Sequence, residues 1–519
     1  MIHIHKMNES YARMEYDDDK ELSLIYNTLS YYVSNYRFMP SYKNGFWDGQ
    51  IHLMDASTGA FPLGLVRHVL KTAKELGIEF KIDSEVARCF IDTSFSKIDF
   101  ERFLQETRFF SGGMEIFPRD DQIEATTRAL ESKRCINLCP TSFGKSLSIT
   151  MECLYLAAQG KTCLIVVPTK DLVDQFANDI KDYATNEDGN LEHWFPVIQK
   201  IYGGKDKEVA DDTQICISTW QSLYSIWKEN KKYINQFDCI CLDECHKSAA
   251  RALQAVMLSA KDVAFRTGWT GTLANDAVNE MLIRGLFGEA RQIITTLELM
   301  DKKIVAQLKI SIIKLVYPDG WGKRFKALDY ANQCKYFEEL PERTNEICRM
   351  ALSRNATGLM LYKKIAHGEA IFAKLKELAP ERNIYLVHSG HFQRNDEKYK
   401  SFEELKPLLE QEQNAILVAN YQLVGTGVSI KNLHFVMFAA PIKSYITTIQ
   451  SIGRGLRVSN TKKAVELIDI VDDMSYKARV NIIQNYALKH YTERYRIYTT
   501  NGFDYTMDSV DIVPKEMTF

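Results

Sequence analysis

The stretch from Cys139 to Ser146 constrains the fold of this chain more than any other feature of its sequence. It reads Cys-Pro-Thr-Ser-Phe-Gly-Lys-Ser, follows a short apolar run and precedes a helical pattern that stops at Gly160. A strand, a tight loop and a helix in this order are typical of a phosphate-binding loop, because backbone N–H groups and the helix N-terminus attract a polyphosphate. We expect Lys145 to reach the β- and γ-phosphates and the Ser146 hydroxyl to bind Mg²⁺. The other loop residues expected at the nucleotide are Pro140, Thr141, Ser142, Phe143 and Gly144.

Cys139 replaces the first glycine of the usual pattern, so the loop needs support from a second motif. That motif is the run from Phe237 to His246, in which an apolar stretch is followed by Asp243 and Glu244. A buried strand would deliver both carboxylates at its C-terminal end, where ligands bind in open α/β sheets. We expect Asp243 to hold Mg²⁺, and Glu244 to orient and deprotonate the water that attacks the γ-phosphate.

Composition sets the broad class of the protein. The 519 residues correspond to about three or four domains, and 45% apolar with 25% charged residues is ordinary for a globular chain. A net charge of −2 means that any nucleic-acid groove must be a local basic patch. The eleven cysteines lie singly in apolar runs, which indicates reduced, buried thiols rather than a zinc site. No apolar run approaches the roughly 18 residues of a membrane span, so we predict a cytoplasmic protein.

Short apolar runs alternate with helical patterns twice along the chain, with a restart near Met300. This alternation predicts two doubly wound α/β domains in tandem. We place a small α+β domain at residues 1–95, the first doubly wound domain with its connecting helix at 96–300, and the second, with a C-terminal helical tail, at 301–519. The expected strands of the second domain are Leu308–Tyr317, Gly358–Tyr362, Asn383–Val387, Ala415–Ala419, Phe435–Ala440 and Val465–Val471.

The N-terminal segment begins with Ile2-His3-Ile4-His5, which alternates like an edge strand, and Asp17 to Asp19 are expected to cap a helix that runs to Leu29. A turn-rich, aromatic and basic stretch follows at residues 37–49, and a helix is expected over 65–76. Aromatic side chains beside cations suit base stacking and phosphate contacts, but they also suit a hairpin with its own small core. From the residues alone we favour the core. The candidate nucleic-acid contacts are Lys43, Phe46, Trp47, Arg67 and Lys71.

Further polar residues stand at expected strand ends and helix starts. Gln122, just upstream of the loop, can pair with an adenine edge. Thr169 either caps a helix or presents its N–H groups to a nucleic-acid phosphate. Arg454 and Arg457 are three residues apart on one expected helix face, which suits a triphosphate bound by the neighbouring domain.

These motifs occur in the order found in superfamily 2 helicases, which the chain therefore resembles. The matching segments are Arg119/Gln122, Gly144 to Ser146, Pro168 to Gln175, Asp243 to His246, Thr270 to Thr272, Gly425 to Gly427 and Gln450 to Arg457. The resemblance implies two RecA-like domains and catalytic roles for Lys145, Asp243, Glu244, Arg454 and Arg457. It also implies nucleotide contacts at Arg119, Gln122, Gly425 and Gly427, and nucleic-acid contacts at Pro168, Thr169, Thr219 and Ser389. Coupling between the two sites is implied for His246, Thr270, Thr272 and Gln450.

The chain is more closely similar to the UvsW-type helicases of T-even-like bacteriophages. This resemblance extends to Gly45-Phe46-Trp47-Asp48-Gly49-Gln50-Ile51, to Pro140-Thr141-Ser142 and to the run from Leu423 to Leu433. It implies an ATP- and Mg²⁺-dependent enzyme that acts on branched DNA and RNA–DNA hybrids without reading their sequence. The expected activities are R-loop and D-loop unwinding, junction migration, fork regression and strand annealing, by a protein expected to be a monomer. The resemblance also favours DNA contact for the aromatic residues near 46.

Three other functions remain compatible with parts of the sequence. An RNA helicase or duplex translocase of the same superfamily would share every motif. A non-catalytic annealing scaffold would keep the fold, although the intact acids and basic residues argue against it. A fused nuclease would need the tail acids Asp504, Asp508 and Asp511, which we interpret as a solvated terminus.

Overall fold

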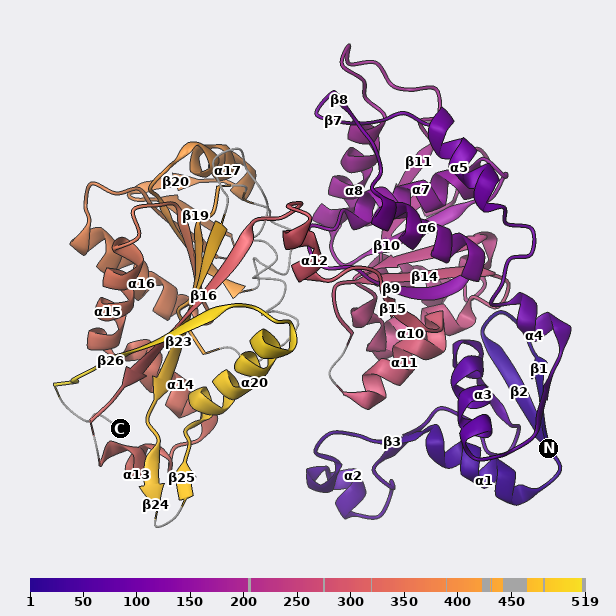
Figure 1. Cartoon of the computed structure of the whole chain (residues 1–519), viewed down its shortest axis with the longest axis horizontal. Helices are drawn as coiled ribbons and strands as arrows, with labels where there is room; N and C mark the ends of the chain where they lie inside the picture. The colour runs from indigo at the N-terminus through magenta and orange to yellow at the C-terminus, as the bar shows by residue number, and fades with distance from the viewer. Residues whose placement is uncertain are drawn as a thin grey trace. The chain divides into compact units, whose positions relative to one another are not determined.

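The computed structural model describes residues 1–203, 207–273, 276–318, 320–388, 390–421, 430, 432–441, 464–478 and 481–515. The chain forms two compact units, Met1–Ile294 and Thr295–Phe519. Figure 1 shows the first unit in indigo to pink and the second in red through orange to yellow. In the described part of the chain, no helix is both long and apolar enough to cross a membrane.

The first unit opens with a small four-stranded sheet in the order β5-β2-β1-β6. Strand β1 runs antiparallel to β2 and parallel to β6, and its apolar side chains Ile2 and Ile4 are fully buried. The expectation of an edge strand is therefore wrong, because β1 has a partner on each side. The elements of this part are β1 (Ile2–Lys6), β2 (Tyr11–Tyr16), α1 (Asp19–Thr28), β5 (Ala60–Pro62), α3 (Val66–Glu75) and β6 (Phe80–Ile82). Asp18 caps α1 by accepting from the Lys20 N–H, as its position in the sequence predicts.

The aromatic stretch lies between the strands of a hairpin, β3 (Ser30–Tyr32) and β4 (Gln50–His52), and contains α2 (Pro40–Lys43). Phe46 is 85% exposed, so the interpretation that it fills a hairpin core is wrong. Trp47 is partly buried, and its Nε1 donates to the Gln50 carbonyl at 2.7 Å. Trp47 thus holds the hairpin while Phe46 faces solvent.

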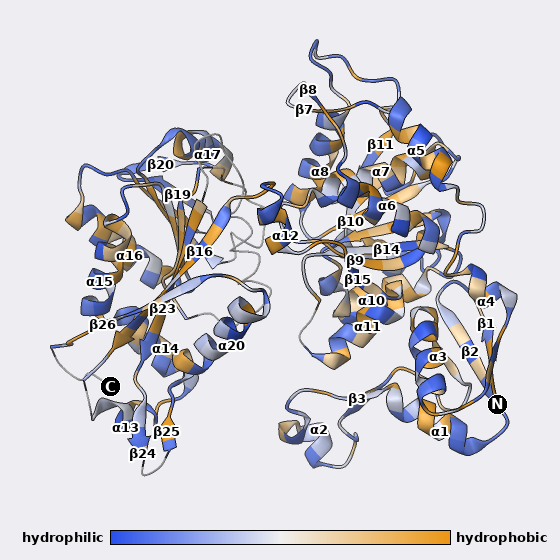
Figure 2. Cartoon of the chain, in the orientation of Figure 1, coloured by the Kyte–Doolittle hydropathy of each residue, from blue (hydrophilic) through white to orange (hydrophobic). Residues whose placement is uncertain are grey.

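A seven-stranded parallel sheet forms the rest of the first unit, in the order β11-β12-β10-β13-β14-β9-β15. Its central strands are continuous apolar runs, as expected for strands covered on both faces. One face packs against α9, α10 and α11, and the opposite face against α7, where Cys153 Sγ lies 3.8 Å from Cys241 Sγ. Figure 2 shows these strands as largely hydrophobic and the surrounding helices as mixed. The bounds are α4 (Ser84–Arg88), α5 (Lys97–Glu106), β7 (Phe109–Ser111), β8 (Met114–Ile116), α6 (Asp120–Ser132), β9 (Arg134–Leu138), α7 (Lys145–Ala157), β10 (Cys163–Val167), α8 (Lys170–Tyr183), β11 (Ile198–Ile201), β12 (Ile215–Thr219), α9 (Trp220–Glu229), β13 (Cys239–Asp243), α10 (Arg251–Ser259), β14 (Phe265–Thr270), α11 (Ala277–Phe287) and β15 (Ala290–Gln292).

Two buried arginines join the small sheet to the parallel sheet within this unit. Arg134, the first residue of β9, donates from Nη2 to Glu9 Oε2 at 2.6 Å. Arg266 on β14 donates from Nη2 to Ser10 Oγ at 2.9 Å, and both guanidiniums are buried. Met281 on α11 belongs to the apolar core of the N-terminal part. The two parts therefore share a continuous interior.

The second unit is built on a nine-stranded sheet in the order β20-β19-β18-β21-β17-β22-β23-β16-β26. All of its pairings are parallel except those of β18 with β19 and of β19 with β20. Helices α14, α15 and α16 cover one face. The bounds are α12 (Thr296–Asp301), β16 (Gln307–Val316), α13 (Trp321–Phe325), α14 (Tyr330–Glu339), α15 (Pro341–Leu352), β17 (Gly358–Tyr362), α16 (Ile365–Leu378), β18 (Ile384–His388), β19 (His391–Arg394), β20 (Glu397–Tyr399), α17 (Phe402–Gln411), β21 (Ile416–Asn420), β22 (Phe435–Phe438), β23 (Ala464–Asp473), β24 (Tyr476–Ala478) and β25 (Asn481–Ile483).

The C-terminal region is more than the predicted helical tail. Helix α20 (Tyr486–Thr500) is followed by strand β26 (Tyr505–Asp511), which runs parallel to β16 at the sheet edge. Arg494 on α20 donates to Asp469 on β23 at 2.8 Å, so the helix is anchored to the sheet by a buried ion pair. Asp508 and Asp511 are exposed, as expected for a solvated terminus, but they lie on a strand that is paired with β16.

Candidate nucleotide and nucleic-acid sites

The predicted phosphate loop lies between β9 and α7, at the carboxyl edge of the first parallel sheet. Gly144 precedes α7 with a φ of 89°, in the left-handed region that favours glycine. A Cβ at this position would lie 2.4 Å from Gln122 Nε2, so a larger residue does not fit. Ser142 also has a positive φ, 69°, which is uncommon for a residue with a side chain. The loop thus has the sharp backbone path that a phosphate-binding loop requires.

Arg119 and Gln122 hold this loop from the start of α6. Arg119 Nη2 donates to the Phe143 carbonyl at 2.6 Å, and Gln122 Nε2 donates to the same oxygen at 3.0 Å. The Gln122 Oε1 accepts from the Arg119 N–H at 3.0 Å. Asp121, which the sequence analysis did not select, accepts from Arg119 Nε at 3.1 Å and so orients the guanidinium. Its position could have identified Asp121, because it is an acid two residues after Arg119 and directly before Gln122.

Asp243 and Glu244 follow β13 at the same edge of the sheet. Asp243 is the last residue of the strand, and Glu244 turns the chain sharply with a φ of 53°. Lys145 Nζ lies 3.9 Å from Glu244 Oε1, so the loop lysine and the second acid are brought together as predicted. Asp243 Oδ1 is buried, and within the described residues it has no hydrogen-bond partner.

The two acids differ in their proton affinity. Burial, and then the negative charge of Glu244, raise the pKa of Asp243 to about 6. Burial also acts to raise the pKa of Glu244, but Lys145 and the hydrogen bond to His246 outweigh it and lower that pKa to about 2. Glu244 is therefore ionised at neutral pH, and Asp243 carries a charge that its surroundings oppose.

The predicted coupling residues His246 and Thr270 meet beside Glu244. The Thr270 Oγ1 lies 2.9 Å from His246 Nδ1 and 3.3 Å from Glu244 Oε2. The Thr270 carbonyl accepts from the Cys139 N–H at 2.8 Å, which links the acid to the start of the phosphate loop. Thr272 donates its N–H to Thr270 Oγ1 at 3.4 Å. Thr270 thus connects Glu244 to the start of the phosphate loop through two hydrogen bonds.

The donor set fits a nucleotide with a divalent cation. The loop offers a lysine and the N-terminus of α7 to the phosphates, and Ser146 offers a hydroxyl. The unpaired Asp243 Oδ1 is an oxygen ligand of the kind that such cations prefer.

The predicted nucleic-acid residues Pro168, Thr169 and Thr219 lie on two adjacent strand ends. Thr169 caps α8 by accepting from the Leu172 N–H at 3.4 Å, and Thr219 caps α9 by accepting from the Ser222 N–H at 3.2 Å. Strands β10 and β12 are paired with Val167 opposite Thr219, so the two helix N-termini lie side by side. The sequence analysis missed Gln221, which bridges them by donating to the Pro168 carbonyl at 3.4 Å.

The N-terminal candidates are dispersed over two elements. Lys43, Arg67 and Lys71 are exposed, and Arg67 lies over the Phe90 ring at 5.5 Å from its centroid. Ser389, Gly425, Gly427, Gln450, Arg454 and Arg457 lie outside the described residues.

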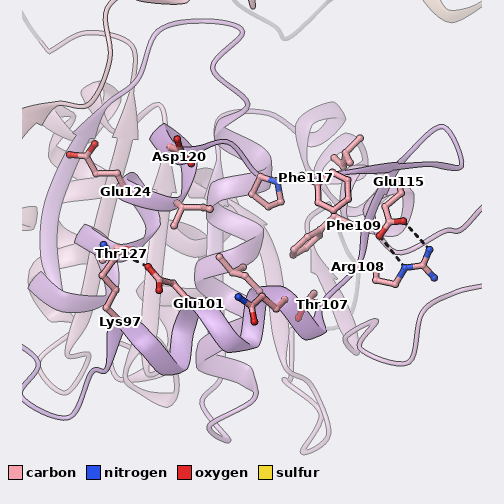
Figure 3. Close-up of a pocket in the computed structure, with 15 residues that line it drawn as sticks. Lys97, Glu101, Thr107, Arg108, Phe109, Glu115, Phe117, Asp120, Glu124 and Thr127 are labelled. Atoms are coloured by element: carbon pink, nitrogen blue, oxygen red, sulfur yellow. Dashed lines mark hydrogen bonds and ion pairs between the residues drawn. The ribbon is translucent and has the colours of Figure 1, made fainter.

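A separate pocket of about 680 Å³ lies between α5, the β7–β8 hairpin and α6 (Figure 3). Its floor is apolar, and its rim carries the Arg108–Glu115 ion pair, in which Arg108 Nη2 lies 3.1 Å from Glu115 Oε2. None of the described candidate residues lines this pocket. On α6, Asp120 and Glu124 face the pocket, whereas the candidate Gln122 points to the phosphate loop.

Two family models match the chain. One described as "DNA helicase UvsW, N-terminal" matches residues 1–83, and one described as "Type III restriction enzyme, res subunit" matches residues 115–275. The chain is similar to the ATP-dependent DNA helicase uvsW of Enterobacteria phage T4, with 31% identity over 98% of this chain and 100% of that protein.

Solved structures show similarity along most of the chain. The crystal structure of T4 UvsW is 28% identical, covers 98% of this chain and 99% of its own, and gives a TM-score of 0.49. A fragment of a putative HsdR subunit of a type I restriction enzyme from Vibrio vulnificus YJ016 is 17% identical, covers 80% and 72%, and gives a TM-score of 0.53. Together with the two family models and the two mainly parallel sheets, the match to the HsdR fragment confirms the predicted fold class, two tandem RecA-like domains preceded by a small α+β domain.

Proposed function

Because this chain belongs to the family of the ATP-dependent DNA helicase UvsW, we propose that it uses ATP to remodel branched DNA and RNA–DNA hybrids. It is an ATP-dependent DNA helicase of superfamily 2, and nucleic acids are its substrates. The finer activities that we propose are R-loop and D-loop unwinding, junction migration and fork regression. The observation that carries the proposal is the position of Glu244, the proposed general base. Its carboxylate lies near Lys145 of the phosphate loop on one side and near the hydrogen-bonded pair Thr270 and His246 on the other.

In this proposal the nucleotide site binds the charged phosphates of ATP and positions the water that attacks them. The Asp243 carboxylate and the Ser146 hydroxyl would hold Mg²⁺, which would neutralise phosphate charge. Lys145 binds the β- and γ-phosphates, and Glu244, ionised because its pKa is about 2, accepts hydrogen bonds from the attacking water and orients it. Arg119 and Gln122 support the loop through the Phe143 carbonyl.

Nucleic acid is proposed to bind by its phosphates at two places. The paired N-termini of α8 and α9 offer backbone N–H groups at Thr169 and Thr219. The N-terminal domain offers the exposed Phe46 and Lys43, the first for stacking on a base and the second for a phosphate. Such contacts position a strand without specifying its sequence.

The proposed domain limits are 1–95, 96–300 and 301–519. Arg454 and Arg457 of the last domain are proposed to reach the triphosphate, one of them as an arginine finger, so that ATP favours closure of the two RecA-like domains. Arg457→Ala should lower turnover by roughly a thousandfold while ATP binding persists. Normal turnover in both single arginine variants would exclude this part of the proposal.

The proposal as a whole is tested by phosphate release on single-stranded, duplex, forked, junction and R-loop substrates, each followed by strand displacement. Branched and R-loop substrates should stimulate hydrolysis most and should be unwound. Equal stimulation by plain duplex, without displacement, would indicate a duplex translocase. Preference for RNA duplexes would indicate an RNA helicase. Annealing without any hydrolysis would indicate a scaffold.

A further inference from the structure

Two histidines and an aspartate meet on the outer face of the N-terminal sheet, outside the nucleotide site. Because β1 is a strand, His3 and His5 point to the same face, opposite to the buried Ile2 and Ile4. Strand β6 pairs with β1 and ends at Ile82, so Asp83 emerges beside both imidazoles.

One carboxylate bridges the two rings. Asp83 Oδ1 lies 2.8 Å from His3 Nε2, and Asp83 Oδ2 lies 2.8 Å from His5 Nδ1. The ring centroids of His3 and His5 are 3.9 Å apart, and one donor atom from each of the three side chains lies within 4.8 Å of the others. His3 and His5 are held by a paired strand, and Asp83 directly follows β6 and donates its N–H to the Ile4 carbonyl at 3.2 Å, so the sheet fixes the spacing of the three donors.

A fourth side chain completes the cluster. Glu15 on β2 is the cross-strand partner of His3, and its Oε2 lies 3.3 Å from His5 Nε2. That nitrogen is buried and, in the part of the chain that the structure describes, makes no hydrogen bond. A histidine that uses one ring nitrogen on an ion commonly turns its other N–H to a carboxylate, which is the position that Glu15 occupies.

A simple surface hydrogen bond is the alternative explanation, and the same domain provides an example of one. His52 contacts Asp48 at 2.8 Å and Ser30 at 2.7 Å, so both of its ring nitrogens are used and no second imidazole is nearby in the described contacts. The His3 cluster differs because two imidazoles converge on one carboxylate, while a second carboxylate, that of Glu15, faces the remaining nitrogen of His5.

We propose that His3, His5 and Asp83 bind a divalent transition-metal cation such as Zn²⁺, with Glu15 orienting His5. Imidazole and carboxylate donors suit Zn²⁺ and its neighbours rather than Mg²⁺. Donors at 2.0–2.1 Å around a tetrahedral ion are about 3.3 Å apart, so the 2.8 Å contacts need to open by only about half an ångström. A water molecule takes the remaining position, since the three side chains are 25–38% exposed.

The ion would tie the first strand of the chain to the segment that leads out of the N-terminal sheet. Asp83 directly precedes α4, which begins the connection to the parallel sheet. The site would thus stabilise the N-terminal domain without entering the ATPase reaction.

Binding is tested on the full chain without an affinity tag, stripped with a chelator and then titrated with ZnCl₂ or CoCl₂. The expected result is one ion per chain, a visible Co²⁺ absorption of the tetrahedral type, and a higher Tm on addition of Zn²⁺. The variant His3→Ala/His5→Ala should lose this absorption and the Tm increase. Glu15→Gln should weaken binding by about 10- to 100-fold.

His52→Gln is the matched control, since it removes a histidine of the same domain that already has two partners, and it should bind the ion like the parent. A parent chain that binds neither ion overturns the proposal. So does an unchanged affinity in the double histidine variant. The titration of the parent protein tests the proposal even if a variant folds poorly. Basal ATPase activity is measured separately.

Discussion

Glu9 Oε2 lies 2.6 Å from Arg134 Nη2, and this ion pair joins the small N-terminal sheet to the strand that leads into the phosphate loop. The Arg134 side chain is fully buried and that of Glu9 is 15% exposed. The N-terminal domain therefore supplies the counter-charge for a guanidinium that is buried at the start of β9 in the parallel sheet.

Glu9→Ala should lower the free energy of unfolding by about 3 kcal/mol, because it leaves Arg134 buried without its carboxylate partner. Urea unfolding of the full chain measures this change. Glu75→Ala removes an exposed carboxylate 3.8 Å from Lys71 and is the control, with an expected change within about 0.5 kcal/mol. Equal effects of the two substitutions would show that the Glu9–Arg134 pair adds nothing to stability.

Glu244→Gln should keep ATP binding and lower phosphate release by about 10²- to 10⁴-fold, because the amide cannot accept a proton from the attacking water. Binding of a fluorescent nucleotide and single-turnover hydrolysis separate the two steps. Glu229→Gln, at an exposed acid near Lys207, should leave both unchanged. Hydrolysis at the parental rate would remove Glu244 from its proposed role.

Asp243→Asn should stabilise the nucleotide-free, Mg²⁺-free protein while abolishing hydrolysis. The pKa of Asp243 is raised to about 6 from a usual value of 3.8. Between these two pH values the carboxyl group is therefore protonated in the native state and ionised in the unfolded state. The cost of the buried charge is therefore absent below about pH 4, grows as the pH rises, and is complete above about pH 6. The variant should gain about 1–3 kcal/mol over the parent at pH 7.5. Thermal unfolding across pH 4–8 measures the gain, and a gain that is constant with pH would contradict the explanation.

Phe46→Ala should leave the fold intact, because the ring is 85% exposed, and should weaken binding to branched DNA by about tenfold if one base stacks on it. Trp47→Ala should instead melt the hairpin, since Nε1 loses its bond to the Gln50 carbonyl. Fluorescence anisotropy and circular dichroism of both variants distinguish these effects. Unchanged affinity in a folded Phe46→Ala protein would place the DNA elsewhere.

Lys43→Ala tests the phosphate contact proposed on the same hairpin. The plot of log affinity for duplex DNA against log salt concentration should flatten by about 0.9, the value for one lost phosphate contact. Lys228, exposed at the C-terminal end of α9, provides a control substitution of equal charge. An unaltered slope would show that Lys43 contacts no phosphate.

Local signals in the sequence predicted the strands, loop and helix that form the candidate nucleotide site. The apolar run, the loop from Cys139 to Ser146 and the following helix are contiguous, so their pattern alone gives the geometry seen at Gly144. Asp243 and Glu244 were likewise found from the strand that precedes them. Their opposite pKa shifts were not predictable, because burial and Glu244 raise the pKa of Asp243 while Lys145 and His246 lower that of Glu244, and these surroundings exist only in the folded chain.

Contacts between distant segments were beyond sequence reasoning. The interior position of β1 depends on β6, about 75 residues later in the chain, and the grouping of His3, His5 and Asp83 depends on the same pairing. Phe46 was assigned to a core because an aromatic residue near a turn gives no sign of which way its ring points. Strand β26 was missed because its pattern, from Tyr505 to Asp511, is polar and its seven residues are mostly exposed.

The placement of β26 has a consequence for how the protein is made. The first strand of the second unit, β16, pairs with β23 and β26, which are the last two long strands of the chain. During synthesis β16 (Gln307–Val316) leaves the ribosome well before β23 (Ala464–Asp473) and β26 (Tyr505–Asp511) exist, with its ten residues unpaired on both sides. Such an open strand is a template for pairing with other chains. A nascent or prematurely stopped product that ends before residue 505 is therefore expected to aggregate or to require a chaperone, and cells should accumulate little of it in soluble form.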